Sequence, residues 1–165
     1  IARRQRQMCI RDRSGAILRS FPHNNLDKLE TILDTTSKAN NKNNRILIVT
    51  EGIFSMDGDS PDLSKIVSLK KKYNALLLVD EAHSFGICGE KGKGTLHQNN
   101  LSEQADFIMA TFGKSAGAAG AVTATSKIWC DLIINKARSF IYSTAPMPEL
   151  ASVSTTDLLS ECAHS

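Results

Sequence analysis

The apolar run from Ala75 to Val79 constrains the fold of this chain more than any other stretch. Asp80, Glu81 and His83 follow it at once. An unbroken apolar run of this length predicts a strand that is buried on both faces of a parallel sheet. In an open α/β sheet, ligands bind beyond the carboxyl ends of the strands. The sequence therefore predicts a functional site at the end of this strand, and the site contains acids and an imidazole.

Strand-like and helix-like patterns alternate along the rest of the chain. Apolar residues at helical spacing predict helices over 26–37, 62–73, 127–137 and 149–162. Apolar runs predict strands over 45–50, 75–79, 105–110 and 121–124, with shorter extended pieces over 14–21 and 138–144. Because strands that alternate with helices form parallel sheets, the predicted fold is α/β, with a mostly parallel sheet flanked by helices.

Three of the predicted helices carry start signals. Asn24 and Asn25 are cap-type residues before the helix over 26–37. Asp62, which follows a proline, is expected to open the helix over 62–73. Ser126 is expected to cap the helix over 127–137, because a serine hydroxyl can accept from the first free backbone N–H groups. The spacing of Ile128, Leu132 and Ile133 predicts the inward face of that helix.

Length and composition narrow the class of protein. A chain of 165 residues is expected to form one domain. Its apolar runs are far shorter than the ~20 residues of a membrane helix, so no membrane partner is predicted. The four cysteines are scattered, without a C-x-x-C pair or a metal-ligand spacing. We therefore expect reduced thiols, a cytoplasmic protein and no metal site.

The segment Asp57-Gly58-Asp59 has the letters of a calcium loop but not its full spacing. An EF-hand needs a glutamate at the twelfth position, and counting from Asp57 that position holds Ser68. We interpret the segment as a turn.

The first thirteen residues are predicted to be foreign to the protein. Residues 8–13 are what the DNA ATG TGT ATA AGA GAC AGN encodes, and this DNA resembles a transposon-end adapter used in sequencing libraries. Without residues 1–13 the chain keeps 15 basic and 16 acidic residues, so its net charge falls from +3 to −1. The basic balance that hinted at nucleic acid disappears, and no nucleic-acid partner is predicted. A genuine basic arm is the alternative, and reading the gene across this junction distinguishes the two.

The letters Asp80-Glu81-Ala82-His83 also spell a motif of a helicase family. That interpretation requires a phosphate loop, G-x-x-x-x-G-K-[ST], ahead of the acidic motif. Gly113-Lys114-Ser115 matches the end of such a loop, but Ile108 stands where its first glycine is needed. The order of the two motifs along the chain is also reversed. An ATPase is therefore disfavoured.

An acid at one strand end and a lysine beyond another favour a pyridoxal phosphate site. This cofactor needs a lysine for its Schiff base and an acid facing its ring nitrogen. Taken singly, Asp80 fits a turn carboxylate, His83 a loop histidine and Lys114 a surface lysine. Together they fall in segments that are predicted to meet at one sheet edge, which favours a common site.

Three motifs in register carry a family resemblance. They are Thr50–Asp59, Val79–Gly86 and Thr111–Lys114. With these motifs the chain, from about Ser14 onward, resembles the α-oxoamine synthases, which are pyridoxal-phosphate enzymes of the aspartate-aminotransferase fold. The resemblance implies that residues 14–165 are part of the large domain of that fold. It also implies a homodimer with shared active sites.

The resemblance implies a reaction as well. Members of the family join an amino acid to an acyl thioester of CoA or of a carrier protein, in most cases with loss of carbon dioxide and the thiol. The segments 111–114 and 141–146 favour the member of biotin biosynthesis, which uses L-alanine and a pimeloyl thioester. The alternatives are the members that use glycine or serine (glycine C-acetyltransferase, 5-aminolevulinate synthase and serine palmitoyltransferase) and a catalytically inactive binding subunit.

Matched position by position, the resemblance implies roles for individual residues. Lys114 matches the Schiff-base lysine, and Asp80 matches the acid that faces the ring nitrogen. His83 and Ser55 match groups near the phenolic oxygen of the ring. Thr111 matches a hydroxyl that binds the phosphate. Thr144 matches a residue that reaches the phosphate bound to the partner subunit.

The resemblance also implies that parts of the family's chain are not included in these 165 residues. In the family, a glycine-containing phosphate segment and a histidine that stacks on the ring precede the matched part, and a small domain follows it. We therefore expect the 165 residues alone to bind the cofactor weakly and to be inactive.

Overall fold

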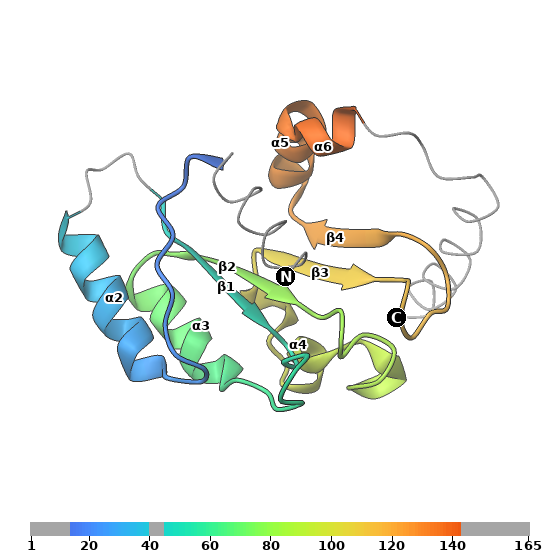
Figure 1. Ribbon diagram of the computed structural model, residues 1–165, viewed down its shortest axis with the longest axis horizontal. Coiled ribbons are helices and arrows are strands. Elements are labelled where there is room, and N and C mark those ends of the chain that lie inside the picture. Colours follow the sequence, from blue (N-terminus) through green and yellow to red (C-terminus); the bar gives the residue numbers. More distant parts are fainter. Residues whose placement is uncertain (1–13, 40–44, 143–165) are drawn as a thin grey trace. The chain divides into compact units, whose positions relative to one another are not determined.

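The computed structural model of the protein describes residues 14–39 and 45–142, apart from the side chains of residues 139 and 140 (Figure 1). The chain divides into two compact units, 1–42 and 43–165. The first contains α2 (Leu26–Ala39), which confirms the helix predicted over 26–37. Residues 16–22 form neither a helix nor a strand, so the strand predicted over 14–21 is wrong. Three adjacent apolar residues do not make a strand unless their backbone groups find a partner strand.

The second unit is built on a four-stranded sheet in the order β1-β2-β3-β4. Its strands are β1 (Leu47–Glu51), β2 (Leu76–Asp80), β3 (Phe107–Thr111) and β4 (Ala121–Thr125). The first three are parallel, whereas β4 pairs antiparallel with β3. The chain between β3 and β4 is too short for the crossover that a parallel neighbour needs, so β4 returns beside β3. The predicted α/β fold with a mostly parallel sheet is confirmed.

Helices and short turns connect these strands. They are α3 (Leu63–Lys72), two 3-10 turns (Glu90–Gly92 and Ser102–Gln104), α4 (Thr95–Gln98), α5 (Lys127–Lys136) and α6 (Arg138–Ile141). The side chain of Asp62 accepts from Lys65 N, so it caps α3 as predicted. The extended piece predicted over 138–144 is wrong as far as residue 141, because the chain forms α6 there. The helix predicted over 149–162 lies outside the described residues.

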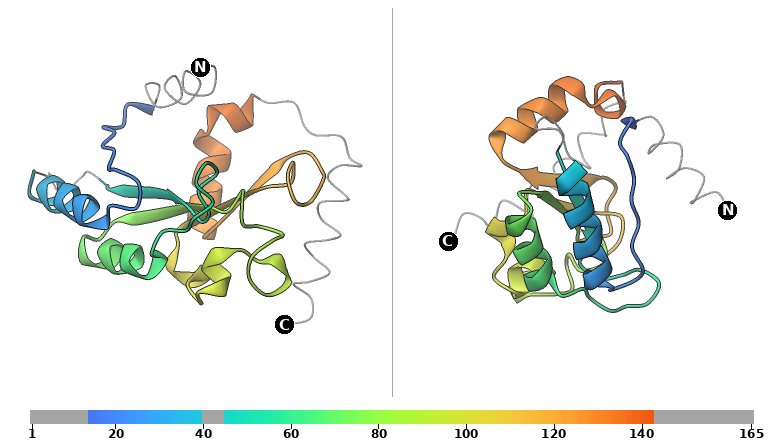
Figure 2. Two further views of the ribbon diagram at one scale, coloured as in Figure 1. Left: turned by 60° about the horizontal axis from the view of Figure 1, so that its bottom comes forward. Right: turned by 90° about the vertical axis from the view of Figure 1, so that its left-hand side faces the viewer.

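The two faces of the sheet differ in burial. Leu77 and Val79 of β2 are fully buried on the face that α3 covers, and Ile66 of α3 is buried with them. On the opposite face, Leu47 and Val49 of β1 are 48% and 57% exposed. The strand over 75–79 was predicted to be buried on both faces, and this holds for one face only, because Leu76 and Leu78 of β2 are half-buried. In the described part of the chain, α5 lies on the second face (Figure 2) and contacts it through a large side chain.

That side chain is Trp129, whose ring lies 5.3 Å from the ring of Phe107 between centroids. The predicted inward face of α5 is wrong for Ile128 and Leu132, which are 80% and 45% exposed, whereas Ile133 is half-buried. Ser126 is the N-cap residue of α5, as predicted, but its hydroxyl makes no capping hydrogen bond. The two rings are tilted by 58° to each other, and the indole is half-buried, so α5 turns the face of Trp129 toward the sheet.

Replacing Ile66 with alanine is expected to lower the free energy of unfolding by about 3 kcal/mol, because it leaves a cavity between α3 and the sheet. The same substitution at Ile128, which is exposed on α5, is the matched control and should change it by less than about 0.5 kcal/mol. Urea denaturation followed by circular dichroism measures both. Equal losses in the two variants would contradict the burial described above.

Candidate functional site

Polar side chains gather at the carboxyl edge of the parallel strands. Glu51 and Asp80 are the last residues of β1 and β2 and are paired in register. Asp80 is in turn paired with Met109 of β3. Residues two apart on a strand point to the same face, so Thr111, the last residue of β3, shares the face of Asp80. A carboxylate and a hydroxyl therefore project from one edge and one face of the sheet.

A lysine and a histidine meet beyond this edge. Lys114 Nζ lies 2.7 Å from His83 Nε2, although the two residues are 31 positions apart in the sequence. His83 belongs to the loop after β2, and Lys114 belongs to the loop after β3. The lysine is exposed and the imidazole is half-buried. The pair can hold or pass a proton between an amine and an imidazole, and the amine can be reached by a ligand.

Further contacts hold the two loops together. Ser115 donates its hydroxyl proton to Phe85 O at 2.6 Å. The rings of Phe85 and Phe112 meet edge to face, with centroids 6.3 Å apart. Gly86 has φ 79°, and a Cβ there would lie 2.6 Å from Ser115 Cβ. The loops that carry His83 and Lys114 are thus packed against each other without room for a larger residue at this point.

The two carboxylate oxygens of Asp80 differ in their hydrogen bonds. Oδ1 accepts from Ala82 N at 2.9 Å, which is the local turn contact expected of an acid at a strand end. In the described part of the chain Oδ2 has no hydrogen-bond partner. Asp80 can therefore stabilise the turn and present a negative charge to a ligand at the same time.

The other predicted site residues, Ser55 and Thr111, do not contact the pair formed by Lys114 and His83 in the described residues. The backbone N–H of Ser55 donates to Glu51 Oε2 at 3.0 Å, which holds Ser55 on the loop after β1. Thr111 Oγ1 donates to Gly120 O at 3.2 Å. Both residues lie at the edge that carries Asp80, and no contact joins either of them to His83 or Lys114 in the described residues. Thr144 lies outside the described residues.

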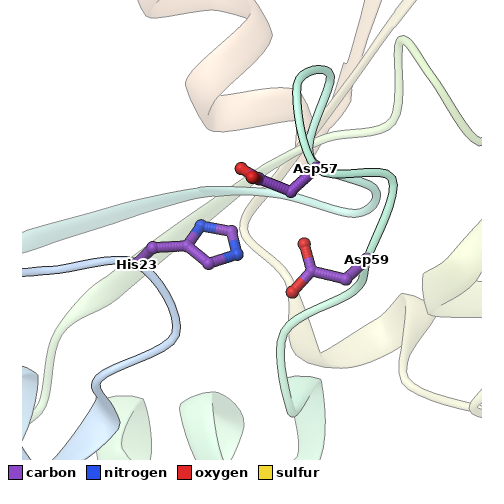
Figure 3. Close-up of side chains that lie close together, drawn as sticks. All are labelled: His23, Asp57 and Asp59. Atoms are coloured by element: carbon purple, nitrogen blue, oxygen red, sulfur yellow. The ribbon is translucent and has the colours of Figure 1, made fainter.

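The segment Asp57-Gly58-Asp59 forms a turn, as predicted (Figure 3). Gly58 N donates to Phe54 O at 2.8 Å, and Phe54 N donates to Asp59 O at 2.9 Å. Gly58 takes φ 73°, a conformation that glycine adopts without steric cost.

Sequence reasoning assigned no role to Glu81, although this carboxylate is almost fully buried beside the site. It also assigned none to Ser115, which joins the two loops. Alternation along β2 is the signal that could have singled out Glu81, because the residue after Asp80 must turn away from the site face.

The groups at this edge fit pyridoxal phosphate by their chemistry. The cofactor presents an aldehyde, a phenolic oxygen, a ring nitrogen and a phosphate. The edge offers the exposed amine of Lys114, the imidazole of His83 and the hydroxyl of Thr111. It also offers Asp80 Oδ2, which has no hydrogen-bond partner among the described residues.

No helix in the described part of the chain is long and apolar enough to cross a membrane.

A mostly parallel sheet with an acid at one strand end and a lysine beyond the next fits the class of pyridoxal-phosphate enzymes of the aminotransferase fold. The profile of the family described as aminotransferase class I and II matches residues 6–162, and the chain belongs to this family. The resemblance that the three motifs predicted is confirmed.

Individual relatives narrow the comparison. An 8-amino-7-oxononanoate synthase from Geobacter sulfurreducens is 45% identical over 78% of this chain and 32% of its own length. The enzyme of the same name from Hydrogenovibrio crunogenus is also 45% identical, over 88% of this chain and 36% of its own. The chain thus spans about a third of the length of the curated relatives it matches.

Solved structures agree on the fold. An 8-amino-7-oxononanoate synthase from Francisella tularensis matches with a TM-score of 0.72 and 30% identity, over 90% of this chain and 41% of that one. A serine palmitoyltransferase from S. paucimobilis with a bound PLP–myriocin aldimine matches with a TM-score of 0.74 and 32% identity, over 81% of this chain and 34% of that one.

Proposed function

We propose that this chain carries the cofactor-binding core of an α-oxoamine synthase of biotin biosynthesis. The observation that carries the proposal is the 2.7 Å contact between Lys114 Nζ and His83 Nε2 beside Asp80, at the carboxyl edge of the sheet. The names of the relatives with 45% identity support the choice of this member of the family. The cofactor is pyridoxal 5'-phosphate.

In this proposal each residue at the edge has a task toward the cofactor. Lys114 would hold the cofactor through its aldehyde carbon, with loss of water, and a substrate amine would take its place. Asp80 faces the ring nitrogen and favours its positive form by charge. His83 and Ser55 contact the phenolic oxygen, and Thr111 contacts the phosphate. When bound, the cofactor supplies an electron sink for a carbanion at the α-carbon of the amino acid.

The reaction joins L-alanine to a pimeloyl thioester of CoA or of a carrier protein. The α-carbon of alanine bonds to the thioester carbonyl carbon, and the thiol leaves. The carboxylate of alanine leaves as carbon dioxide, and a proton takes its place. In this proposal Lys114, once free as an amine, moves the α-proton, and its contact with His83 supports sharing of that proton with the imidazole.

A serine-using member of the family is the second candidate. The likeness to serine palmitoyltransferase, with a TM-score of 0.74, favours it. The two candidates share the cofactor and Lys114, and they differ in the amino acid that displaces the lysine.

Trapping the cofactor on the protein tests this proposal. Protein expressed from its complete open reading frame is reduced with borohydride and digested, and a pyridoxyl adduct is sought by mass spectrometry. We expect the adduct on Lys114 and a change of absorbance with L-alanine. A response to serine or glycine alone would keep the cofactor and change the member of the family. Absence of the adduct with cofactor in excess would contradict the proposal and favour an inactive binding subunit.

We further propose a cytoplasmic homodimer with shared active sites, in which Thr144 reaches the phosphate bound to the partner subunit. The family resemblance supports this arrangement. Light scattering after size-exclusion chromatography measures the oligomeric state of the same preparation. The 165 residues expressed alone are expected to bind the cofactor weakly, since they span about a third of the relatives' length.

A further inference from the structure

Glu81 is a buried carboxylate that the proposed chemistry does not use. Only 1% of its surface is exposed. Thr95 N and Leu96 N donate to its two oxygens at 3.0 and 2.8 Å. The hydroxyls of Thr95 and Ser84 donate to it as well. A buried charge is costly unless it is paired or hydrogen-bonded, and here hydrogen bonds from four groups satisfy it, with no ion pair in the described residues.

Two glycines make room for this carboxylate. A Cβ on Gly52, at the end of β1, would collide with Glu81 Oε2 and with the hydroxyl of Thr95. A Cβ on Gly94, before α4, would lie 2.9 Å from Glu81 Cδ. Gly52 does not have a positive φ, so among the described residues it is this close approach, and not backbone strain, that favours glycine at that position. Glu81 thus occupies a socket formed by two separate segments of the chain.

The socket fixes the segment that carries the site. Glu81 lies between Asp80 and His83, and its N–H donates to Met109 O of β3 at 2.7 Å. Its side chain holds the same segment to the start of α4, which lies beside the loop after β2 (Figure 1). Backbone and side chain of one residue therefore fasten this segment to β3 and to α4 in different directions.

We propose that Glu81 is a positioning residue, whose carboxylate fastens the loop after β2 to α4 and so sets the contact between His83 and Lys114. This inference rests on the proposed function, because it concerns the same site. The physical reason is that a displacement of about 1 Å at a reacting group can lower a rate about 10²-fold. A residue that only stabilised the fold would change the unfolding midpoint without changing the geometry of the folded site.

Glu81→Gln tests the inference in protein expressed from its complete open reading frame. Glutamine keeps the shape but turns one acceptor oxygen into an NH2 that faces other donors. Glu90→Gln, exposed on the same loop, is the matched control. Without cofactor, the ¹⁵N shift of His83 Nε2 reports its contact with Lys114. With cofactor and substrates, kcat and KM are measured for thiol release.

We expect Glu81→Gln to change the His83 shift and to lower kcat at least about 10-fold while KM changes less than about 3-fold. The control should match the parent in both measurements. An unchanged His83 shift overturns the inference, and so does a changed shift with an unchanged kcat. If Glu81→Gln does not fold, Thr95→Val, which removes one hydroxyl donor, is judged by the same two measurements.

The two proposals fail in different ways. A parent protein without the Lys114 adduct contradicts the proposed function, and the His83 shift of the cofactor-free protein still tests whether Glu81 sets the contact. A parent with the adduct and a Glu81→Gln variant with parental kcat contradicts the positioning role alone.

Discussion

Replacing Lys114 with alanine is expected to abolish thioester-dependent turnover and the borohydride adduct. The substitution removes the amine that bonds the cofactor and the base that moves the α-proton. Proton transfer by a positioned side chain alone is worth about 10²- to 10⁴-fold in rate. Turnover in protein from the complete open reading frame, with mass spectrometry of the reduced digest, measures both losses.

Lys136→Ala is the matched control for Lys114→Ala, because Lys136 is exposed in the last turn of α5. It should leave turnover and the adduct unchanged. Circular dichroism should show all three proteins folded, since Lys114 is exposed and its removal leaves no cavity. An adduct on another lysine in Lys114→Ala would contradict the assignment.

Replacing Asp80 with asparagine is expected to lower kcat about 10- to 10³-fold and to change the absorbance of the bound cofactor. An opposite charge a few ångströms away favours a charged group by that factor, and asparagine removes the charge. Its Oδ1 can still accept from Ala82 N, so the turn at the end of β2 is kept. The substitution therefore separates the electrostatic role of Asp80 from its role in the turn.

Asp62→Asn is the matched control for Asp80→Asn. Its Oδ1 can still accept from Lys65 N and cap α3, because asparagine caps helices as well as aspartate does. Turnover and absorbance should match those of the parent. Parental kcat in Asp80→Asn, with the cofactor bound, would contradict a charge facing the ring nitrogen.

Most of the sheet and the class of the site could be predicted from the sequence. The strands β1, β2 and β3 lie within one or two residues of their predicted bounds at most ends, because unbroken apolar runs that end in polar groups are a local signal. The position of Asp80 at the carboxyl end of β2 follows from the same signal. The class of cofactor followed from the pairing of an acid with a lysine.

The tertiary structure alone decided which groups touch. His83 and Lys114 are 31 residues apart, and their 2.7 Å contact depends on how two irregular loops pack. The hydrogen bond from Ser115 to Phe85 O and the socket of Glu81 are likewise made between distant segments. No local periodicity encodes such contacts, because loop conformations follow from the surfaces they meet.

Packing also overruled the local pattern in α5. The spacing of its apolar residues predicted Ile128 and Leu132 inward, yet both are exposed, and Trp129 contacts Phe107 instead. The sequence by itself determined the order of the four strands and of α2, α3 and α5, and the acid, imidazole and amine that follow the strands. The tertiary structure decided which face of each element is buried, because the burial of large side chains depends on residues far apart in the chain. It also decided which loops meet, because buried polar groups find their hydrogen-bond partners in distant segments.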